Sequence, residues 1–592
     1  MSERDRGAAA RAAMLKGEAD RKADNAAAAR EEAEKNRPPV VCLGTEGACN
    51  VYWSRSSGTL HRLKANEHTR NNLYRMARFE EYARWMRPDL PPDDAEDQEA
   101  AIMKKAVRRL LEGSLGKRFN ASRVRGRGVW PDAAGGWVYN AGESCWAIPA
   151  DGGQVEQVDA VWGGYVYSAG DALPFPADTP LSDEESRLLL ELIESRSWML
   201  PGAGKIMGGW MVSALLAGVM PICPHVWINA PASTGKSTFR DDLRAVYGEA
   251  KIDPDGGHTT DTGIRQTITG VALPVVIDEA EGGDDEKAQK NIRRWIELMR
   301  IASYGGTILH GGADGTPRKY SIKCSFALFS VSNSIERAAD SSRCLVLDLK
   351  KYREDEQGKA EKEALWARQE AGRELVQTPG FHSRLMARLL ACLPVLMENL
   401  AALRKLLGKV EGVDSRRAEL FSVLMACRHA LVSRERMSQE AMQEAAGVMQ
   451  AYGEQEEHES DFTRCLRVLL DVYQIDVYGA GKMNVTEACR MLNKMIDGDR
   501  KDAIERALNL SGMRWRNDLN ALQVDTLADK MKRIYTGTQW SNGKIAPVLA
   551  EGCERKKGSI SPAGVWLQSV KVGGASPRWC VMIPAALVLG DE

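Results

Sequence analysis

The sequence predicts an α/β protein of several domains with a P-loop core in its middle part. The chain has 592 residues, more than one hydrophobic core usually organises. Residues 226–238 combine a buried apolar strand, a short loop and the start of a helix, which is the order that a P-loop requires. The apolar runs 273–277 and 326–331 predict two further strands of this core.

The composition is that of an ordinary globular protein, with 44% hydrophobic and 27% charged residues. Its 80 basic and 81 acidic side chains nearly cancel, so any nucleic-acid contact must be a local patch. The 12 cysteines form no CxxC pair and no ligand cluster, which predicts reduced thiols. The sequence has no apolar run of membrane-spanning length and no signal-peptide core. We therefore expect a soluble cytoplasmic protein with no membrane contact.

Shifts in composition along the chain predict five segments. Residues 1–37 are rich in alanine and charge and lack the large apolar side chains that a core needs. Short β-type runs follow, with helices near 66–86 and 93–113 between them. A capping box at Ser182–Glu185 opens the first helix of the central domain. The predicted segments are a charged tail (1–37), an α+β domain (38–176), a P-loop ATPase domain (177–350), a helical lid or bundle (351–460) and a winged-helix-like region (461–592).

The run RVRGRGVW in the α+β domain places Arg123, Arg125 and Arg127 at alternate positions, followed by Trp130. Alternation would put the three cations on one face of a strand, where they suit phosphate and base contacts. An exposed edge strand with a solvated charged face shows the same pattern. The three arginines are candidate DNA contacts.

The stretch HVWINAPASTGKST carries the strongest signal in the chain. Backbone N–H groups of the loop and of the following helix would point at the β- and γ-phosphates of ATP. Lys236 would supply a cation, Ser237 would coordinate Mg²⁺, and Gly235 would let the backbone approach closely. The pattern departs from GxxxxGK[ST] at its first position, where alanine replaces glycine. The predicted ATP-binding residues are Ala230, Pro231, Ala232, Ser233, Thr234, Gly235, Lys236, Ser237 and Thr238.

The next apolar strand ends in two carboxylates, Asp278 and Glu279. Asp278 would hold the magnesium through water, and Glu279 would orient and polarise the attacking water. The pair therefore predicts hydrolysis of the nucleotide in addition to its binding.

Two polar residues lie beside the later strands. Asn333 follows the run 326–331, where an amide could sense the γ-phosphate or hold the lytic water. Arg343 precedes the run 344–347, and a guanidinium at such a turn could stabilise phosphoryl transfer at a neighbouring subunit's nucleotide. A surface ion pair is the alternative role for Arg343.

With these elements in order, the chain resembles the ring-forming superfamily 3 helicase branch of AAA+ ATPases, and more closely the helicase-like replication ATPases of phages and prophages. The resemblance covers residues 40–350 and part of the tail, through RVRGRGVW, YVYSAGDALPFPADTPLSDEE, HVWINAPASTGKS, GIRQTITG, PVVIDEAE, GADGTPRKYSIKCSFALFSVSN, ADSSR and YTGTQWSNG. It implies a hexameric or heptameric ring that threads DNA. The roles that it implies are a Walker A pair at Lys236 and Ser237, a Walker B pair at Asp278 and Glu279, a sensor at Asn333 and an arginine finger at Arg343.

A hairpin is predicted between the Walker B pair and the sensor. An amphipathic helix is followed there by turn residues at 311–317, with β-type runs on both sides. In related ring helicases a hairpin at this place lines the pore and grips the DNA backbone, for which Arg318 and Lys319 near the tip have the right charge. An ordinary exposed turn is the alternative.

The region 461–592 shows twice a pattern of helices followed by a β-hairpin. This pattern predicts winged-helix modules in tandem, with hairpins near 513–524 and 565–583. Basic side chains there could touch DNA, but such modules also serve protein contacts.

The sequence thus favours an ATP- and Mg²⁺-dependent DNA helicase or translocase of a phage-type replication module. We expect it to act as a homo-oligomeric ring, with hexameric the expected form, on single-stranded or forked DNA, with phage replication proteins as partners. The alternative is an ATP-switched assembly or defence ATPase that hydrolyses ATP without unwinding DNA. A primase fused to a helicase is disfavoured, because residues 38–176 show no convincing acidic metal triad or zinc-ligand set.

Overall fold

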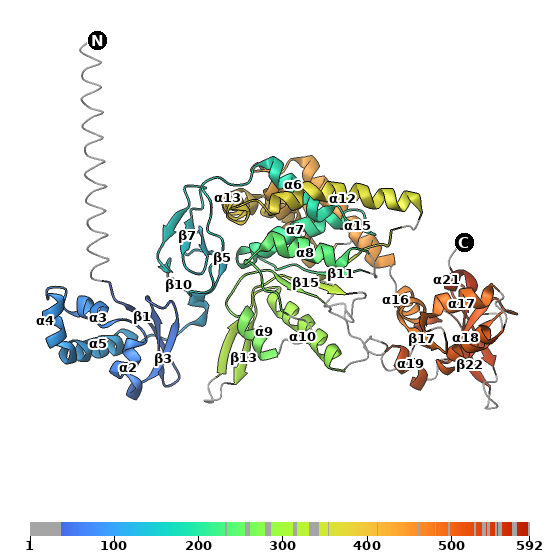
Figure 1. Ribbon diagram of the computed structural model, residues 1–592, viewed down its shortest axis with the longest axis horizontal. Helices are drawn as coiled ribbons and strands as arrows, with labels where there is room; N and C mark the ends of the chain where they lie inside the picture. Colours follow the sequence, from blue (N-terminus) through green and yellow to red (C-terminus); the bar gives the residue numbers. More distant parts are fainter. Residues whose placement is uncertain are drawn as a thin grey trace, which may run out of the picture. The chain divides into compact units, whose positions relative to one another are not determined.

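The computed structural model divides the chain into two compact units, drawn together in Figure 1. Unit 1 comprises residues up to 175 with the segments 269–271 and 307–321, and unit 2 comprises 176–268, 272–306 and the chain from 322 onward. The structure describes residues 37–230, 234–254, 261–278, 286–311, 317–330, 343–352, 355–410, 413–458, 461–479, 481–494, 498–525, 528–535, 540, 545–550, 553, 559–570 and 577–589.

The first part of unit 1 is a three-stranded antiparallel sheet with short helices packed against it. Its core forms where Tyr52 of the middle strand meets Leu73, Tyr82 and Leu110 of the helices. The helices confirm those predicted near 66–86 and 93–113. The elements are β1 (Val40–Glu46), β2 (Cys49–Ser54), β3 (Leu60–Lys64), η1 (Ala65–Glu67), α2 (Arg70–Tyr74), α3 (Phe79–Met86), α4 (Pro92–Asp97) and α5 (Glu99–Ser114).

Two small sheets complete the α+β part of unit 1. One has the strand order β4-β10-β9, and the other is an antiparallel meander, β5-β6-β7-β8. Between β4 and β5, the Gly126 N–H donates to the Gly270 carbonyl at 2.6 Å, which joins the RVRGRGVW segment to residues 269–271. The elements are η2 (Ala121–Arg123), β4 (Val124–Arg125), β5 (Gly128–Pro131), β6 (Trp137–Asn140), β7 (Cys145–Ile148), β8 (Glu156–Val158), β9 (Val161–Trp162) and β10 (Tyr165–Tyr167).

The predicted hairpin between Asp278 and Asn333 is confirmed. Its strands, β13 (Thr307–Gly311) and β14 (Pro317–Ser321), pair antiparallel, and both belong to unit 1. A segment that the sequence places inside the ATPase domain is therefore packed with the N-terminal part of the chain.

Unit 2 contains a four-stranded sheet with the order β12-β15-β11-β16, and every neighbouring pair is parallel. Strands β11, β12 and β15 are buried along their whole length, as expected for a parallel sheet covered on both faces. In Figure 1, α7 and α8 lie on one side of this sheet and α10 lies on the other. The mixed α/β class is confirmed. The strands are β11 (His225–Asn229), β12 (Val275–Ile277), β15 (Phe326–Ser330) and β16 (Cys344–Asp348).

Two features of the helices next to this sheet agree with the sequence analysis. The expected capping box is present, because the Ser182 hydroxyl accepts from the Glu185 N–H at 3.1 Å and the Glu185 carboxylate accepts from the Ser182 N–H at 2.9 Å. The amphipathic helix buries Trp295 and Met299, as its spacing predicted. The helices are α6 (Asp183–Glu194), α7 (Ala203–Leu215), η3 (Ala217–Val219), α8 (Lys236–Tyr247), α9 (Asp261–Ile268) and α10 (Glu286–Ala302).

The segment after the sheet consists of long helices. By length and composition α13 is the one helix among the described residues that could cross a membrane, and 61% of its most apolar window is buried inside the protein. Core helices of soluble proteins have the same character. The helices are α12 (Glu356–Val376), α13 (Phe381–Leu407), α14 (Ser415–Val432) and α15 (Gln439–His458).

The C-terminal region differs from the expected tandem modules. Its two predicted hairpins join one four-stranded sheet, β19-β20-β22-β21, over one core that runs from Cys465 to Val588. Strand β22 pairs with both β20 and β21, so neither hairpin closes a module by itself. The elements are α16 (Asp461–Arg467), η4 (Val468–Val472), β17 (Gln474–Val477), β18 (Gly481–Asn484), α17 (Val485–Asn493), α18 (Asp499–Leu510), β19 (Met513–Arg516), β20 (Ala521–Val524), α19 (Ala528–Ile534), α20 (Ala546–Leu549), β21 (Trp566–Val570), β22 (Arg578–Pro584) and α21 (Ala585–Leu589).

Candidate functional site

The start of α8, the helix that follows β11, has the geometry of a helix start that can bind an anion. Gly235 caps the helix with φ of 87°, a left-handed conformation that glycine adopts without the steric cost of a side chain. Helix α8 begins at Lys236, so the N–H groups of its first turn face the loop and not an earlier turn of helix. These groups and the helix dipole together favour a bound anion such as a phosphate.

Six of the nine predicted ATP-binding residues lie at this junction in the described structure. Ala230 extends β11 by one residue, because its N–H donates to the Ser330 carbonyl of β15 at 2.9 Å. Thr234 is buried, Lys236 is half-buried and Ser237 is exposed. The described residues are Ala230, Thr234, Gly235, Lys236, Ser237 and Thr238, while Pro231, Ala232 and Ser233 lie outside the described part of the chain.

The parallel sheet brings the end of β12 to the edge where the loop begins. Strand β15 lies between β11 and β12 and pairs with both in parallel, so the carboxyl ends of all three strands share one edge. In open parallel sheets this edge is the usual place for ligands. Asp278 directly follows β12 there. Glu279 and Asn333 fall outside the described residues.

Asp278 contacts α8 through an ion pair that the sequence reasoning missed. The Arg240 guanidinium donates from Nη1 to the Oδ2 of Asp278, and the two side chains are 20% and 21% exposed. Arg240 lies one helical turn after Lys236, so the contact holds the Asp278 carboxylate beside the start of α8. The available sequence signal was the spacing of Lys236 and Arg240, because residues four apart share one face of a helix.

The donor set at this edge suits Mg²⁺ better than a softer metal. Asp278 and Ser237 offer a carboxylate and a hydroxyl, and Mg²⁺ prefers oxygen ligands. Within the described ranges no three His, Cys, Asp or Glu side chains gather as a metal cage. Mg²⁺ at nucleotide sites is commonly held by one or two protein groups, with phosphate and water oxygens completing its shell.

Arg343 lies at the opposite edge of the sheet from Lys236. It directly precedes β16, and its carbonyl accepts from the N–H of His225, the first residue of β11, at 3.3 Å. The five residues of β11 span roughly 16 Å at the usual rise of a strand. The backbone of Arg343 is therefore separated from Ala230, which follows β11 in the same chain, by the length of that strand.

His225 is a buried polar residue that connects this amino-terminal edge to α10. The Phe326 N–H donates to Nδ1 at 3.2 Å, so the proton of the neutral ring lies on Nε2, which is 2.7 Å from the Met299 carbonyl. Burial lowers the pKa of His225 to about 3; the hydrogen bond to Met299 opposes this shift and the charge of Arg343 adds to it. His225 is thus held neutral.

The three arginines of RVRGRGVW do not lie on one strand face, which corrects the expected arrangement. Arg123 ends η2 and donates to the Gly164 carbonyl at 2.9 Å. Arg125 is buried, with its guanidinium 3.3 Å from the centre of the Tyr165 ring and a hydrogen bond to a carbonyl. Arg127 lies 3.4 Å from the Asp171 carboxylate. Gly126 interrupts the strand because β4 ends at Arg125, so strict alternation is lost.

The predicted basic pair lies within the hairpin strand and not in its turn. Arg318 and Lys319 are the second and third residues of β14, in register with His310 and Leu309 of β13. The turn itself, residues 312–316, lies outside the described residues.

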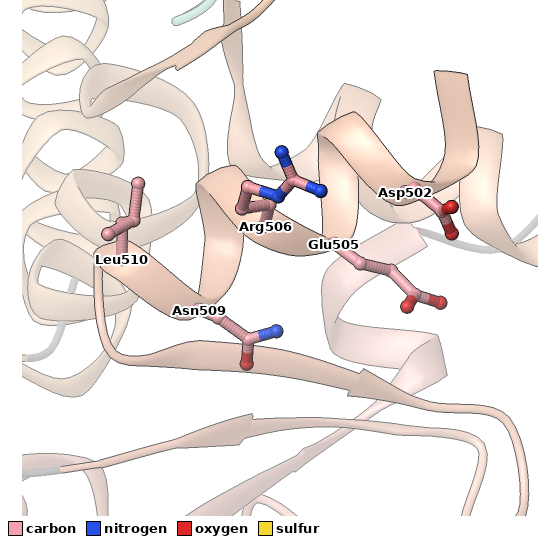
Figure 2. A pocket seen from close by; sticks show the side chains of 5 residues that line it. All are labelled: Asp502, Glu505, Arg506, Asn509 and Leu510. Carbon is pink, nitrogen blue, oxygen red and sulfur yellow. The ribbon is translucent and has the colours of Figure 1, made fainter. Parts of the chain in front are cut away.

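The C-terminal region presents an open depression on one face of α18, with a volume of about 410 Å³. Figure 2 shows the five side chains around it, and all of them come from this one helix. They are Asp502, Glu505, Arg506, Asn509 and Leu510. Two carboxylates against one guanidinium make this surface unfavourable for the phosphate backbone of DNA.

No protein-family model matches the chain, and no curated protein matches it. A solved structure described as "SCCmec type IV Cch - active helicase" is similar to it over 93% of this chain and 95% of that chain. The two share 11% sequence identity, and the TM-score is 0.38.

Proposed function

We propose that this chain is an ATP-dependent DNA helicase or translocase that acts as a ring of identical subunits, as the superfamily 3 resemblance implies. One observation carries the nucleotide part of the proposal. A buried parallel strand leads into a helix start capped by Gly235, and Asp278 from a second parallel strand is held against the same helix by Arg240. A helix start suited to phosphate and a carboxylate suited to Mg²⁺ therefore lie at one edge of the sheet, which supports the proposal.

Each proposed site residue has a distinct task in this reaction. The first-turn N–H groups of α8 and the Lys236 ammonium bind the β- and γ-phosphates, and Ser237 and Asp278 hold the Mg²⁺ that neutralises them. Glu279 orients the attacking water and accepts its proton, while Asn333 contacts the γ-phosphate. Arg343 stabilises the transferring phosphoryl group on the neighbouring subunit. Its place at the far edge of its own sheet supports action in trans.

The proposed DNA contacts all lie in unit 1. Residues 123–127 and the β13–β14 hairpin belong to this one compact unit, although almost 200 residues of sequence separate them. Of the three arginines, Arg123 and Arg127 remain the stronger candidates, because Arg125 is buried against aromatic rings. Single-stranded or forked DNA and the proteins of a phage-type replication module are the proposed partners.

The second candidate function is an ATP-switched assembly or defence ATPase that does not unwind DNA. The α18 depression favours it, because a surface with two carboxylates and the 76% exposed Leu510 suits a protein partner better than a phosphate backbone. ATP hydrolysis that single-stranded DNA leaves unchanged would select this candidate.

The proposal is tested by separating binding from hydrolysis. Lys236→Ala should abolish ATP binding, whereas Glu279→Gln should bind ATP and fail to hydrolyse it, because only the second variant keeps the phosphate cation. ATP-analogue titration and phosphate release measure the two steps, and addition of single-stranded DNA should accelerate release by the unaltered protein. Equal loss of binding in both variants would contradict the assigned roles.

A further inference from the structure

Arg240 occupies a particular place relative to the proposed nucleotide site. It stands one turn into α8 after Lys236 and donates to Asp278 and also, from Nε at 2.9 Å, to Asp241. The Arg240 and Asp278 side chains are both about one-fifth exposed, so the pair lies at the rim of the site and not in the core. Solvent and small ions can therefore reach the ion pair.

The same Asp278 carboxylate is the one that the proposed function assigns to Mg²⁺. A guanidinium and a divalent cation on one carboxylate repel each other and compete for the same oxygens. Resting on that proposed function, we propose that Arg240 is a displaceable counter-ion that holds Asp278 in the nucleotide-free protein and leaves it when Mg²⁺ and nucleotide bind. Arg240 is a positioning residue in this scheme, and it sets the Mg²⁺ concentration at which the site fills.

The replacement of Arg240 by Mg²⁺ on Asp278 also links binding of the metal to α8. While the pair is formed, Asp278 at the end of β12 is tied to the helix whose first turn binds phosphate. When Mg²⁺ takes the carboxylate, Arg240 keeps Asp241 as its partner, so the charge is not left isolated.

Arg244 supplies a matched control on the same helix. It lies one turn beyond Arg240, is similarly half-buried and pairs with Asp253 at 2.6 Å and with Asp241 at 3.7 Å. Neither partner is a proposed ligand of Mg²⁺ or nucleotide, although Asp241 also pairs with Arg240. Arg244→Gln therefore removes a similar charge without freeing Asp278.

The test is equilibrium binding of a fluorescent ADP analogue to the full chain, titrated with Mg²⁺ from a chelated start. Arg240→Gln should lower the half-saturating Mg²⁺ concentration about fivefold, the order expected for removing one competing, partly exposed ion pair. Arg240→Lys should lie between it and the unaltered protein, and Arg244→Gln should match the unaltered protein. Thermal melting in metal-free buffer shows whether each variant is folded.

The outcomes separate this inference from the proposed function. An unchanged or raised Mg²⁺ requirement in Arg240→Gln, with a raised requirement in Asp278→Asn, would overturn the counter-ion role and leave the metal assignment intact. If Asp278→Asn kept the Mg²⁺ dependence of the unaltered protein, the metal assignment would fail, and the role of Arg240 would fail with it.

Discussion

Asp242 of α8 accepts two hydrogen bonds from Arg373 of α12, from Nε to Oδ1 and from Nη2 to Oδ2, both at 3.0 Å. Arg196 donates to the same carboxylate at 2.7 Å. The Asp242 side chain is 10% exposed and the Arg196 side chain 7%, and the Arg196 guanidinium also lies 4.7 Å from the centre of the Phe239 ring. The helix that begins at Lys236 is thus fixed to the helical segment by a buried charge network.

Asp242→Asn should destabilise the protein by about 3 kcal/mol, because it leaves the buried guanidinium of Arg196 and the partly buried guanidinium of Arg373 without their compensating charge. Denaturant unfolding of the full chain measures this loss. Glu356→Gln on α12 is the control, since that side chain is 89% exposed and pairs only at the surface. A loss equal to that of the control would show that the network contributes nothing to stability.

Protonation of His225 should weaken the fold in acid. Its pKa of about 3 in the folded protein lies below the ordinary value of 6.5, so the unfolded chain takes up a proton that the folded chain refuses. The contribution of His225 to the free energy of unfolding should be fully present above pH 6.5 and should decrease as the pH falls toward 3. The decrease should be at most about 1.4 kcal/mol per pH unit. Thermal melting across this range should show a shallower acid loss for His225→Asn. An identical pH slope in the two proteins would contradict the assignment.

Arg343→Ala should leave ATP binding intact and slow hydrolysis, because the proposed contact is made to the neighbouring subunit. Mixtures of Arg343→Ala with Lys236→Ala subunits should regain part of the activity, since some interfaces then pair an intact loop with an intact arginine. Phosphate release as a function of mixing ratio measures the rescue. If no mixture exceeds its parents, action in trans loses its support.

Replacing Arg318 and Lys319 together by alanine should weaken single-strand binding regardless of DNA sequence. The slope of log affinity against log salt should flatten by roughly one to two units, and DNA-stimulated but not basal ATPase should be lost. A charge-matched control replaces Lys104 and Arg108, two exposed cations of α5 in the same unit. Binding titrations at several salt concentrations distinguish the two double variants. Unchanged affinity and stimulation in the hairpin variant would move the contact to residues 123–127 or to the C-terminal region.

Local sequence determined the elements of this protein and the order in which they occur. Buried strands were predictable at β11, β12, β15 and β16, since unbroken apolar runs of this length suit strands covered on both faces. The start of α6 was predictable from the capping box, and the β13–β14 hairpin from its turn residues. These features depend on side-chain period and backbone preference, which neighbouring residues set.

Tertiary structure alone decided which of these elements meet. The placement of β15 between β11 and β12, the return of the hairpin to unit 1 and the joining of two hairpins into one C-terminal sheet depend on pairings between distant segments. The contacts of Arg240 with Asp278 and of Asp242 with Arg373 are of the same kind. Spacing along the chain can place a residue on one face of a helix, as it does for Arg240, but it does not select the distant partner, because the free energy that selects partners comes from burying surfaces and charges that only the folded chain brings together.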